Sequence, residues 1–246
     1  MGQTALLIAG LLLMTGAAAG TGSHQPPPFQ RGGAGFLALG LEWTDLEDLN
    51  RTFRRTGFPP LEERFVSLGG GVWTFLGRVL IGGEGHGILD QRTTVGRREA
   101  HITGFQGFFD LGYLIARSPA WQAYGLIGLG GGRWFLRIQE SGRLPDFRGL
   151  LRWPEGSARL MTGGVLLQAA VGLDVRLPVV RRPRYQGDFL LGLRVSYVWQ
   201  PGEAGWRLDD GTPIVGGPDV RLTGPSVRLT LGWQRLRMRR SEASRP

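Results

Sequence analysis

Hydrophobic and polar residues alternate with a period of two through most of the chain between residues 33 and 236. From Met161 to Leu177, every second residue is apolar or glycine, and the residues between them are mainly small or polar. Successive side chains of a β-strand point to opposite faces, whereas a helix would mix the two sets on every face. The segment is therefore predicted to be a strand with one apolar face.

The same alternation recurs in seven further segments, clearly in the last two and with more noise in the earlier ones. The predicted strands cover residues 36–43, 64–76, 79–87, 100–115, 121–138, 161–177, 189–199 and 226–234. The pattern leaves open which face of the glycine-rich second strand is apolar. No stretch of residues 20–246 has the roughly 20 apolar residues of a transmembrane helix. Only a closed barrel satisfies the backbone hydrogen bonds of strands in lipid, so we predict an antiparallel up-and-down transmembrane β-barrel of about eight strands.

The predicted connections alternate in length. Long links follow the first, third, fifth and seventh strands, at residues 44–63, 88–99, 139–158 and 201–223. Short links follow the other three, at residues 77–78, 116–120 and 178–187. Outer-membrane barrels have short periplasmic turns and longer outer loops, so this asymmetry favours an outer-membrane location over a soluble sandwich.

The two faces of the predicted strands differ in chemistry. The apolar, lipid-facing side places aromatic residues near strand ends, as membrane barrels do at both interfaces; these are Trp43, Tyr113, Phe189, Tyr197, Trp199 and Trp233. The inward side carries charges of both signs, namely Glu42, Glu84, His86, Asp110, Asp174, Arg176, Arg194 and Arg228. An eight-stranded interior is just wide enough for side chains to fill, so we expect a charged lumen closed by an ion-pair network.

The first long link contains a helix signal. Thr44-Asp45-Leu46-Glu47 has the form of a capping box, and Leu46, Leu49 and Phe53 then share one helical face up to the stop at Gly57. Two placements are compatible with this pattern: a helix over the barrel mouth or membrane interface, and an ordinary loop helix packed on the rim.

The chain ends and the composition add the cellular context. Residues 1–19 have the apolar core and small residues of a signal peptide, residues 20–32 form a proline-rich linker, and residues 237–246 a basic polar tail. All 29 basic residues are arginine, no cysteine is present, and the net charge is +9. An exported protein rarely meets nucleic acid, so the expected partners are outer-membrane lipid and lipopolysaccharide.

Candidate chemistry is sparse. Glu84 and His86 share a face but point inward, with no serine nearby, which indicates a buried structural pair. His101 and Thr103 would need threonine as the nucleophile. Three widely spaced histidines without cysteine do not indicate a metal site, and the glycine runs lack the lysine of a phosphate loop. We expect no catalytic residues, no metal and no cofactor.

Residues 33–236 resemble the small outer-membrane β-barrel proteins of the OmpA membrane-domain and OmpX type. The resemblance rests on the signal peptide, alternating strands, aromatic strand ends and loop asymmetry. It implies insertion by the outer-membrane assembly machinery and a structural or surface-interaction role. The last strand departs from the type, since it continues past Trp233 into an arginine-rich tail instead of ending on an aromatic residue. The alternatives are a soluble lipocalin-like barrel that binds a hydrophobic ligand and, third, a lipid-modifying barrel enzyme.

Overall fold

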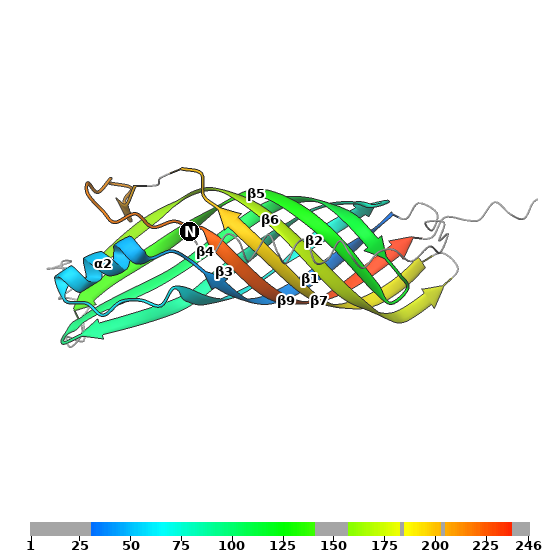
Figure 1. The fold of residues 1–246 in the computed structure, drawn as a ribbon, viewed down its shortest axis with the longest axis horizontal. Helices are drawn as coiled ribbons and strands as arrows, with labels where there is room; N and C mark the ends of the chain where they lie inside the picture. Colours follow the sequence, from blue (N-terminus) through cyan, green and yellow to red (C-terminus); the bar gives the residue numbers. More distant parts are fainter. Residues whose placement is uncertain (1–30, 141–156, 183–184, 203–204, 238–246) are drawn as a thin grey trace, which may run out of the picture.

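The structure, a computed structural model, describes residues 31–140, 157–182, 185–202 and 205–237. Its wall is one antiparallel sheet of eight long strands in chain order, which closes because β1 pairs with both β2 and β9 (Figure 1). The strands are β1 (Arg31–Trp43), β2 (Arg64–Leu76), β3 (Val79–Val95), β4 (Arg98–Arg117), β5 (Trp121–Glu140), β6 (Ser157–Arg182), β7 (Tyr185–Trp199) and β9 (Gly224–Arg237). The two-residue β8 (Arg207–Leu208) pairs with β6 in the last loop. The predicted up-and-down barrel of eight strands is confirmed.

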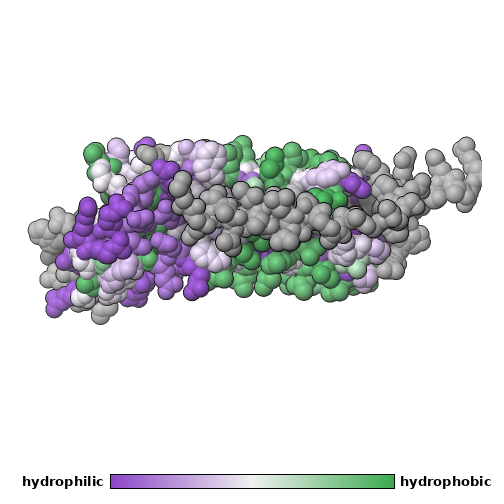
Figure 2. All heavy atoms as spheres, viewed as in Figure 1, coloured by the Kyte–Doolittle hydropathy of each residue, from purple (hydrophilic) through white to green (hydrophobic). Residues whose placement is uncertain are grey.

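The wall is apolar on its outer side. Large apolar side chains that would be buried in a soluble protein are exposed here, with Leu37 at 68% and Leu229 at 59%. We call this ring the apolar belt; it includes Leu37, Leu39, Leu68, Val72, Phe109, Ile115, Ile127, Leu129, Val165, Leu173, Val175, Leu191, Leu193, Leu229 and Leu231. On the face drawn in Figure 2, hydrophobic residues gather over one part of the barrel, whereas hydrophilic residues cover the end that carries the helix. A continuous exposed apolar ring is stable in lipid but not in water, so the belt marks the membrane-spanning part.

The pairing also fixes the facing of β2. Val72 is 67% exposed in the belt, whereas Phe65, Trp73 and Phe75 are buried inside the barrel. Its two faces carry similar numbers of large apolar residues, which is why the alternation alone did not distinguish them.

Two predicted links are strand in the structure. Residues 88–99, expected as a long loop, extend β3 and β4 to a tight turn at Gly96 and Arg97, where Gly96 has a φ of +57°. The pairing shifts between Ile88 and Gln91 at a β-bulge, which breaks the alternation and hides the strand. Most of residues 178–187, expected as a short link, likewise extend β6 to Arg182 and start β7 at Tyr185.

The helix α2 (Glu47–Thr56) lies in the first long loop, but its predicted capping box does not form. The Thr44 backbone N–H donates to the Glu63 carbonyl at 2.8 Å, so Thr44 continues the strand pair. The carboxylate of Asp45 accepts from the Glu47 N–H at 3.0 Å instead, and the helix starts after Leu46. The predicted stop is confirmed: Gly57 adopts a left-handed φ of +82° and its N–H donates to the Arg54 carbonyl.

The apolar face of α2 closes the end of the barrel beyond the belt. At this end, β3 to β6 extend further than the other strands (Figure 1). Helix α2 and the loop after β7 pack against the inner face of these extensions. We call this the upper apolar layer; it is formed by Leu46, Leu49, Phe53, Phe58, Leu61, Phe65, Ile88, Ala100, Ile102, Phe108, Trp134, Leu136, Leu166, Val198, Trp206, Val220 and Leu222. The predicted helix face is therefore buried, and it covers the mouth of the barrel.

The predicted signal peptide, nearly all of the proline-rich linker and the basic tail beyond Arg237 lie outside the described residues, as does most of the link at 139–158. Strand β1 begins at Arg31, slightly before the expected barrel start. Within the described ranges, no helix combines the length and apolar character needed to cross a membrane.

Candidate functional site

Charged side chains gather at mid-height inside the barrel, as expected from the inward faces of the strands. Arg228 on β9 donates to Glu42 at 2.8 Å and lies 3.8 Å from a Glu84 oxygen. Arg194 on β7 forms a direct ion pair with Glu84, and His86 Nε2 lies 3.4 Å from the same carboxylate. All five side chains are buried. We call them the central charged layer.

Arg194 is held by aromatic rings as well as by charge. Its guanidinium carbon lies 4.5 Å from the ring centre of Trp73, 4.8 Å from Phe36 and 5.8 Å from Tyr124. Ring faces attract cations, and more strongly where water is excluded. None of these rings was among the predicted lumen residues, which were chosen for charge, and the alternation of β2 also left the facing of Trp73 open.

Amides donate to the carboxylates of this layer, and a pair of hydroxyls lies beside Arg228. Gln106 donates to Glu42 at 2.8 Å and Gln168 donates to Glu84 at 2.8 Å. The Ser196 hydroxyl accepts from Arg228 at 3.2 Å and lies 2.6 Å from the Ser226 hydroxyl. These polar residues share the inward parity of the predicted charges, so the same alternation could have identified them.

The other predicted lumen residues form separate groups. Asp174 accepts hydrogen bonds from Gln122 at 2.9 Å and from the Tyr124 hydroxyl at 3.3 Å. Nearer the short turns, Arg176 pairs with Asp188 and donates to the Ser118 carbonyl at 3.0 Å. Asp188 was missed because it precedes the predicted start of its strand.

Asp110, also buried, stands in register between two glycines, Gly82 on β3 and Gly128 on β5. All eight predicted lumen residues therefore lie inside the barrel, distributed over more than one layer.

A second apolar cluster lies on the short-turn side of the lumen. We call it the lower apolar layer; it consists of Ala34, Phe36, Ala38, Trp73, Phe75, Leu80, Leu114, Tyr124, Leu126, Ala170, Leu190 and Leu236. The lumen is thus filled in sequence by the upper apolar layer, the central charged layer and the lower apolar layer. The inward charges of the strands predicted a charged lumen, but not the apolar layers that lie on either side of the charged layer.

The six predicted girdle aromatics all point outward and lie at two levels. Trp43, Tyr197 and Trp199 lie at the ends of β1 and β7 that lead into long loops. Tyr113, Phe189 and Trp233 lie at the short-turn side, where Phe189 is in register with Trp233. Trp121, at the start of β5 and 40% exposed, was not among the predicted residues.

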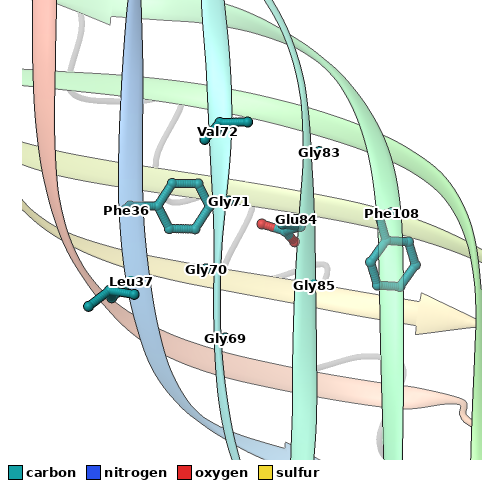
Figure 3. Close-up of a pocket in the computed structure, with 10 residues that line it drawn as sticks. All are labelled: Phe36, Leu37, Gly69, Gly70, Gly71, Val72, Gly83, Glu84, Gly85 and Phe108. Atoms are coloured by element: carbon teal, nitrogen blue, oxygen red, sulfur yellow. The ribbon is translucent and has the colours of Figure 1, made fainter.

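The wall beside Glu84 is thin. Figure 3 shows Glu84 among glycines of β2 and β3, with Phe36 and Phe108 on either side. Gly85 faces outward, where an added Cβ would meet nothing closer than the Gln106 carbonyl oxygen at 3.8 Å. The outer surface is therefore a shallow hollow in the apolar belt.

A groove of about 460 Å³ lies on the outer wall of β3 to β6 and contains His101. The bulge in β3 brings Asp90 beside it, with Asp90 Oδ2 at 3.0 Å from His101 Nδ1. The Thr103 hydroxyl also lines the groove but donates to the Ile88 carbonyl at 2.7 Å. Since His101 Nε2 faces Glu99 at 3.4 Å, both ring nitrogens face carboxylates and Thr103 has no activating base.

Among the residues that the structure describes, no group of three or more histidine, aspartate or glutamate side chains is placed to hold a metal ion.

Three solved structures are similar to this chain along most of its length. Ail, the attachment invasion locus protein of Yersinia pestis, has 11% identity and a TM-score of 0.38, and the match covers 85% of this chain and 97% of Ail. Neisserial surface protein A has 9% identity and a TM-score of 0.40, covering 83% and 95%. The outer-membrane protease OmpT from Escherichia coli has 9% identity and a TM-score of 0.35, covering 89% and 99%. No protein-family model and no curated protein matches the sequence.

The type of barrel follows from the geometry of the chain itself. Eight antiparallel strands close into a ring, an apolar belt surrounds it, and aromatic residues lie at both edges of the belt. These are the features of an outer-membrane β-barrel. The predicted outer-membrane location is confirmed, whereas the finer resemblance to the OmpA and OmpX type stays a prediction.

Proposed function

We propose that this protein is a non-enzymatic outer-membrane barrel with a structural or surface-interaction role, and that its filled lumen does not conduct. The observation that carries the proposal is the hydrophilic end of the barrel beyond the apolar belt, which consists of α2 and the extended ends of β3 to β6 (Figure 2). We call this end the head, and the lumen below it is filled. Such a head presents a rigid surface beyond the membrane without needing a pore.

The height of the head supports a surface role. On β5, outward residues from Trp121 to Arg133 span about 29 Å along the barrel axis, for a rise of about 3.4 Å per residue and a tilt of about 45°. This matches an apolar band of about 25 Å. The strand continues to Glu140, so this wall extends about 17 Å beyond the belt by the same estimate.

The composition of the head supports contact with the outer leaflet and its surroundings. The outward residues of α2 include Arg51, Arg54 and Arg55. We propose outer-membrane lipid and lipopolysaccharide as the neighbours of this surface, and the outer-membrane assembly machinery as the partner during biogenesis. Nucleic acid is not a proposed partner, because an exported barrel does not meet it.

The proposed orientation is tested with single cysteines, which the chain allows because it has none of its own. Val215, 97% exposed in the loop after β7, is changed to cysteine on the head side. Ala120, exposed in the turn between β4 and β5, is the matched change on the other side. Intact cells are treated with a membrane-impermeant maleimide, and folding is followed by heat-dependent migration on a denaturing gel.

We expect Val215→Cys to be labelled on intact cells and Ala120→Cys only after lysis. The reverse pattern, or a protein that is soluble without detergent, contradicts the proposed function.

A further inference from the structure

The outer wall of β3 to β6 carries four basic side chains in direct register just beyond the apolar belt. Arg92 on β3 pairs with His101 on β4, His101 with Arg137 on β5, and Arg137 with Arg159 on β6. We call these four residues the basic row. Side chains directly opposite on one face lie about 5 Å apart, and like charges there are destabilising unless an anion compensates them.

The carboxylates near the row leave one arginine uncompensated. Arg92 pairs with Glu99, His101 lies 3.0 Å from Asp90, and Arg159 lies 3.3 Å from Asp209. Within the described part of the chain, Arg137 has no acidic partner. Because the Arg159–Asp209 pair is more than half exposed on both sides, an incoming anion can share Arg159 at little cost.

Two arginines of the basic row lie in the groove on the outer wall of β3 to β6 and not on a flat surface. Arg137 and Arg159 line the groove together with Phe135, Thr103, Gln139 and the Asp90–His101 pair, in which the Asp90 carboxylate is already engaged. Two planar guanidinium groups side by side match the oxygens of a phosphate, to which arginine donates paired hydrogen bonds.

The position of the groove indicates a ligand that is part lipid. Phe135 stacks with Phe105 at 6.0 Å between ring centres, and Phe105 is 48% exposed at the edge of the apolar belt. On the β5 estimate, Arg137 lies about 10 Å beyond Arg133, where the belt ends. A ligand with its phosphate at Arg137 would therefore have its acyl chains against the belt.

We propose that this groove binds a phosphate of the lipopolysaccharide headgroup through Arg137 and Arg159, with Phe135 as the apolar floor. The proposal rests on the proposed outer-membrane location and adds to it a defined lipid site on one side of the barrel.

The test compares two double variants of the full mature protein, folded in detergent. Arg137→Gln with Arg159→Gln removes the proposed contacts, and both side chains are exposed, so the barrel should still fold. Arg31→Gln with Arg78→Gln removes the same charge from exposed positions on the short-turn side of the barrel, away from the groove, and serves as the control. Native mass spectrometry measures retention of bisphosphorylated lipid A, of the dephosphorylated lipid, and of the bisphosphorylated lipid in competition with inorganic phosphate.

We expect the groove variant to retain the bisphosphorylated lipid at least about tenfold less than the wild type, since two charge-assisted contacts are lost. The control variant should retain it normally, and the wild type should retain the dephosphorylated lipid as poorly as the groove variant retains the phosphorylated one. Equal retention by both variants, or equal retention of the dephosphorylated lipid, overturns the proposal. Displacement by millimolar inorganic phosphate would instead make this a site for the free anion, which also overturns it.

Heat-dependent migration and the labelling of Val215→Cys are measured on the same variants. If these remain normal while lipid retention does not depend on the groove, only the lipid site fails. If they fail in the protein that carries neither the groove nor the control substitutions, the outer-membrane proposal fails first.

Discussion

At the scale of single residues, the two arginines of the central charged layer are both fully buried and paired with carboxylates. Arg194 and Arg228 are each about 1% exposed, yet their guanidinium groups reach Glu84 and Glu42. Taking a charge out of water is costly, so each such residue depends on its partner. Removing one partner should therefore cost more than removing both.

We expect Arg194→Met to lower the free energy of unfolding by about 3 kcal/mol, because it leaves the Glu84 carboxylate in a buried, partly compensated position. The double variant Glu84→Gln with Arg194→Met should regain much of that loss. Urea unfolding in lipid vesicles, followed by tryptophan fluorescence, measures both. A double variant whose loss equals the sum of the two single losses would show that the pair is not coupled.

Glycines give a second prediction at this scale, since those facing inward leave room for large side chains. A Cβ at Gly172 would lie 2.3 Å from the Tyr124 ring, which is buried and packs edge-on against Trp73. Gly172→Ala should destabilise the barrel by about 1–3 kcal/mol, as overpacking does in tight cores. The same urea titration provides the measurement.

Gly85→Ala is the matched control, because Gly85 faces lipid and its added methyl group meets nothing closer than the Gln106 carbonyl oxygen at 3.8 Å. It should leave stability within about 0.5 kcal/mol of the wild type, or raise it slightly through the unfolded chain. Equal losses for the two variants would mean that backbone preference, and not packing, determines where the glycines lie.

At the scale of elements, the side-chain amide of Asn50 links α2 to the segment that follows it in the same loop. Asn50, 5% exposed, donates to the Leu61 carbonyl at 2.9 Å and accepts from the Leu61 N–H at 2.7 Å. Asn50→Ala leaves both backbone groups without a partner in a buried place. The helix should then open locally while the strands stay paired.

Trypsin measures this opening, since Arg51, Arg54 and Arg55 lie within the helix. We expect cleavage of folded Asn50→Ala at these sites to be at least about tenfold faster than that of the wild type. Thr52→Ala, on the exposed face of the same helix, should be cleaved at the wild-type rate. A similar rate for all three proteins would show that the apolar face alone holds the helix in place.

The elements also show which parts of the fold a sequence can reveal. Alternation placed the eight strands because lipid outside and side chains inside impose opposite demands on neighbouring residues. It failed at residues 88–99, where the bulge shifts the register and the wall leaves the lipid, so outward residues such as Arg92 become polar. The facing of β2 was undecided because its inner face carries Phe65, Trp73 and Phe75, which belong to apolar layers inside the barrel.

The candidate site was likewise predictable from the sequence only in part. The parity of each strand identified the eight inward charged residues, but their partners depend on which strands meet across the barrel. Glu84 and Arg194 are 110 positions apart, and they pair because β3 and β7 face each other across the lumen. The basic row escaped notice for a related reason, because only the register of four strands aligns Arg92, His101, Arg137 and Arg159.

At the scale of the whole molecule, two apolar layers and the charged layer between them close the same passage. The upper apolar layer depends on α2 and the loop after β7, whereas the central and lower layers belong to the strands themselves. An apolar layer excludes ions because they cannot leave water for it cheaply, and a saturated ion-pair layer leaves no free charge to bind them. Each layer should therefore block conduction without the others.

Planar-bilayer recording tests this redundancy. The wild-type protein should show no stepwise conductance above the bare membrane. A second variant, in which a short turn replaces residues 45–62, lacks α2 and part of the upper apolar layer. We expect it to show no conductance either, because Arg194 and its aromatic neighbours still fill the middle of the lumen. Adding Arg194→Ala and Trp73→Ala to that variant removes one large side chain from the central layer and one from the lower layer. Steps should then appear if the protein still folds, which heat-dependent migration checks. Steps in the wild type would contradict a sealed lumen, and steps in the helix-replaced variant alone would assign the seal to α2.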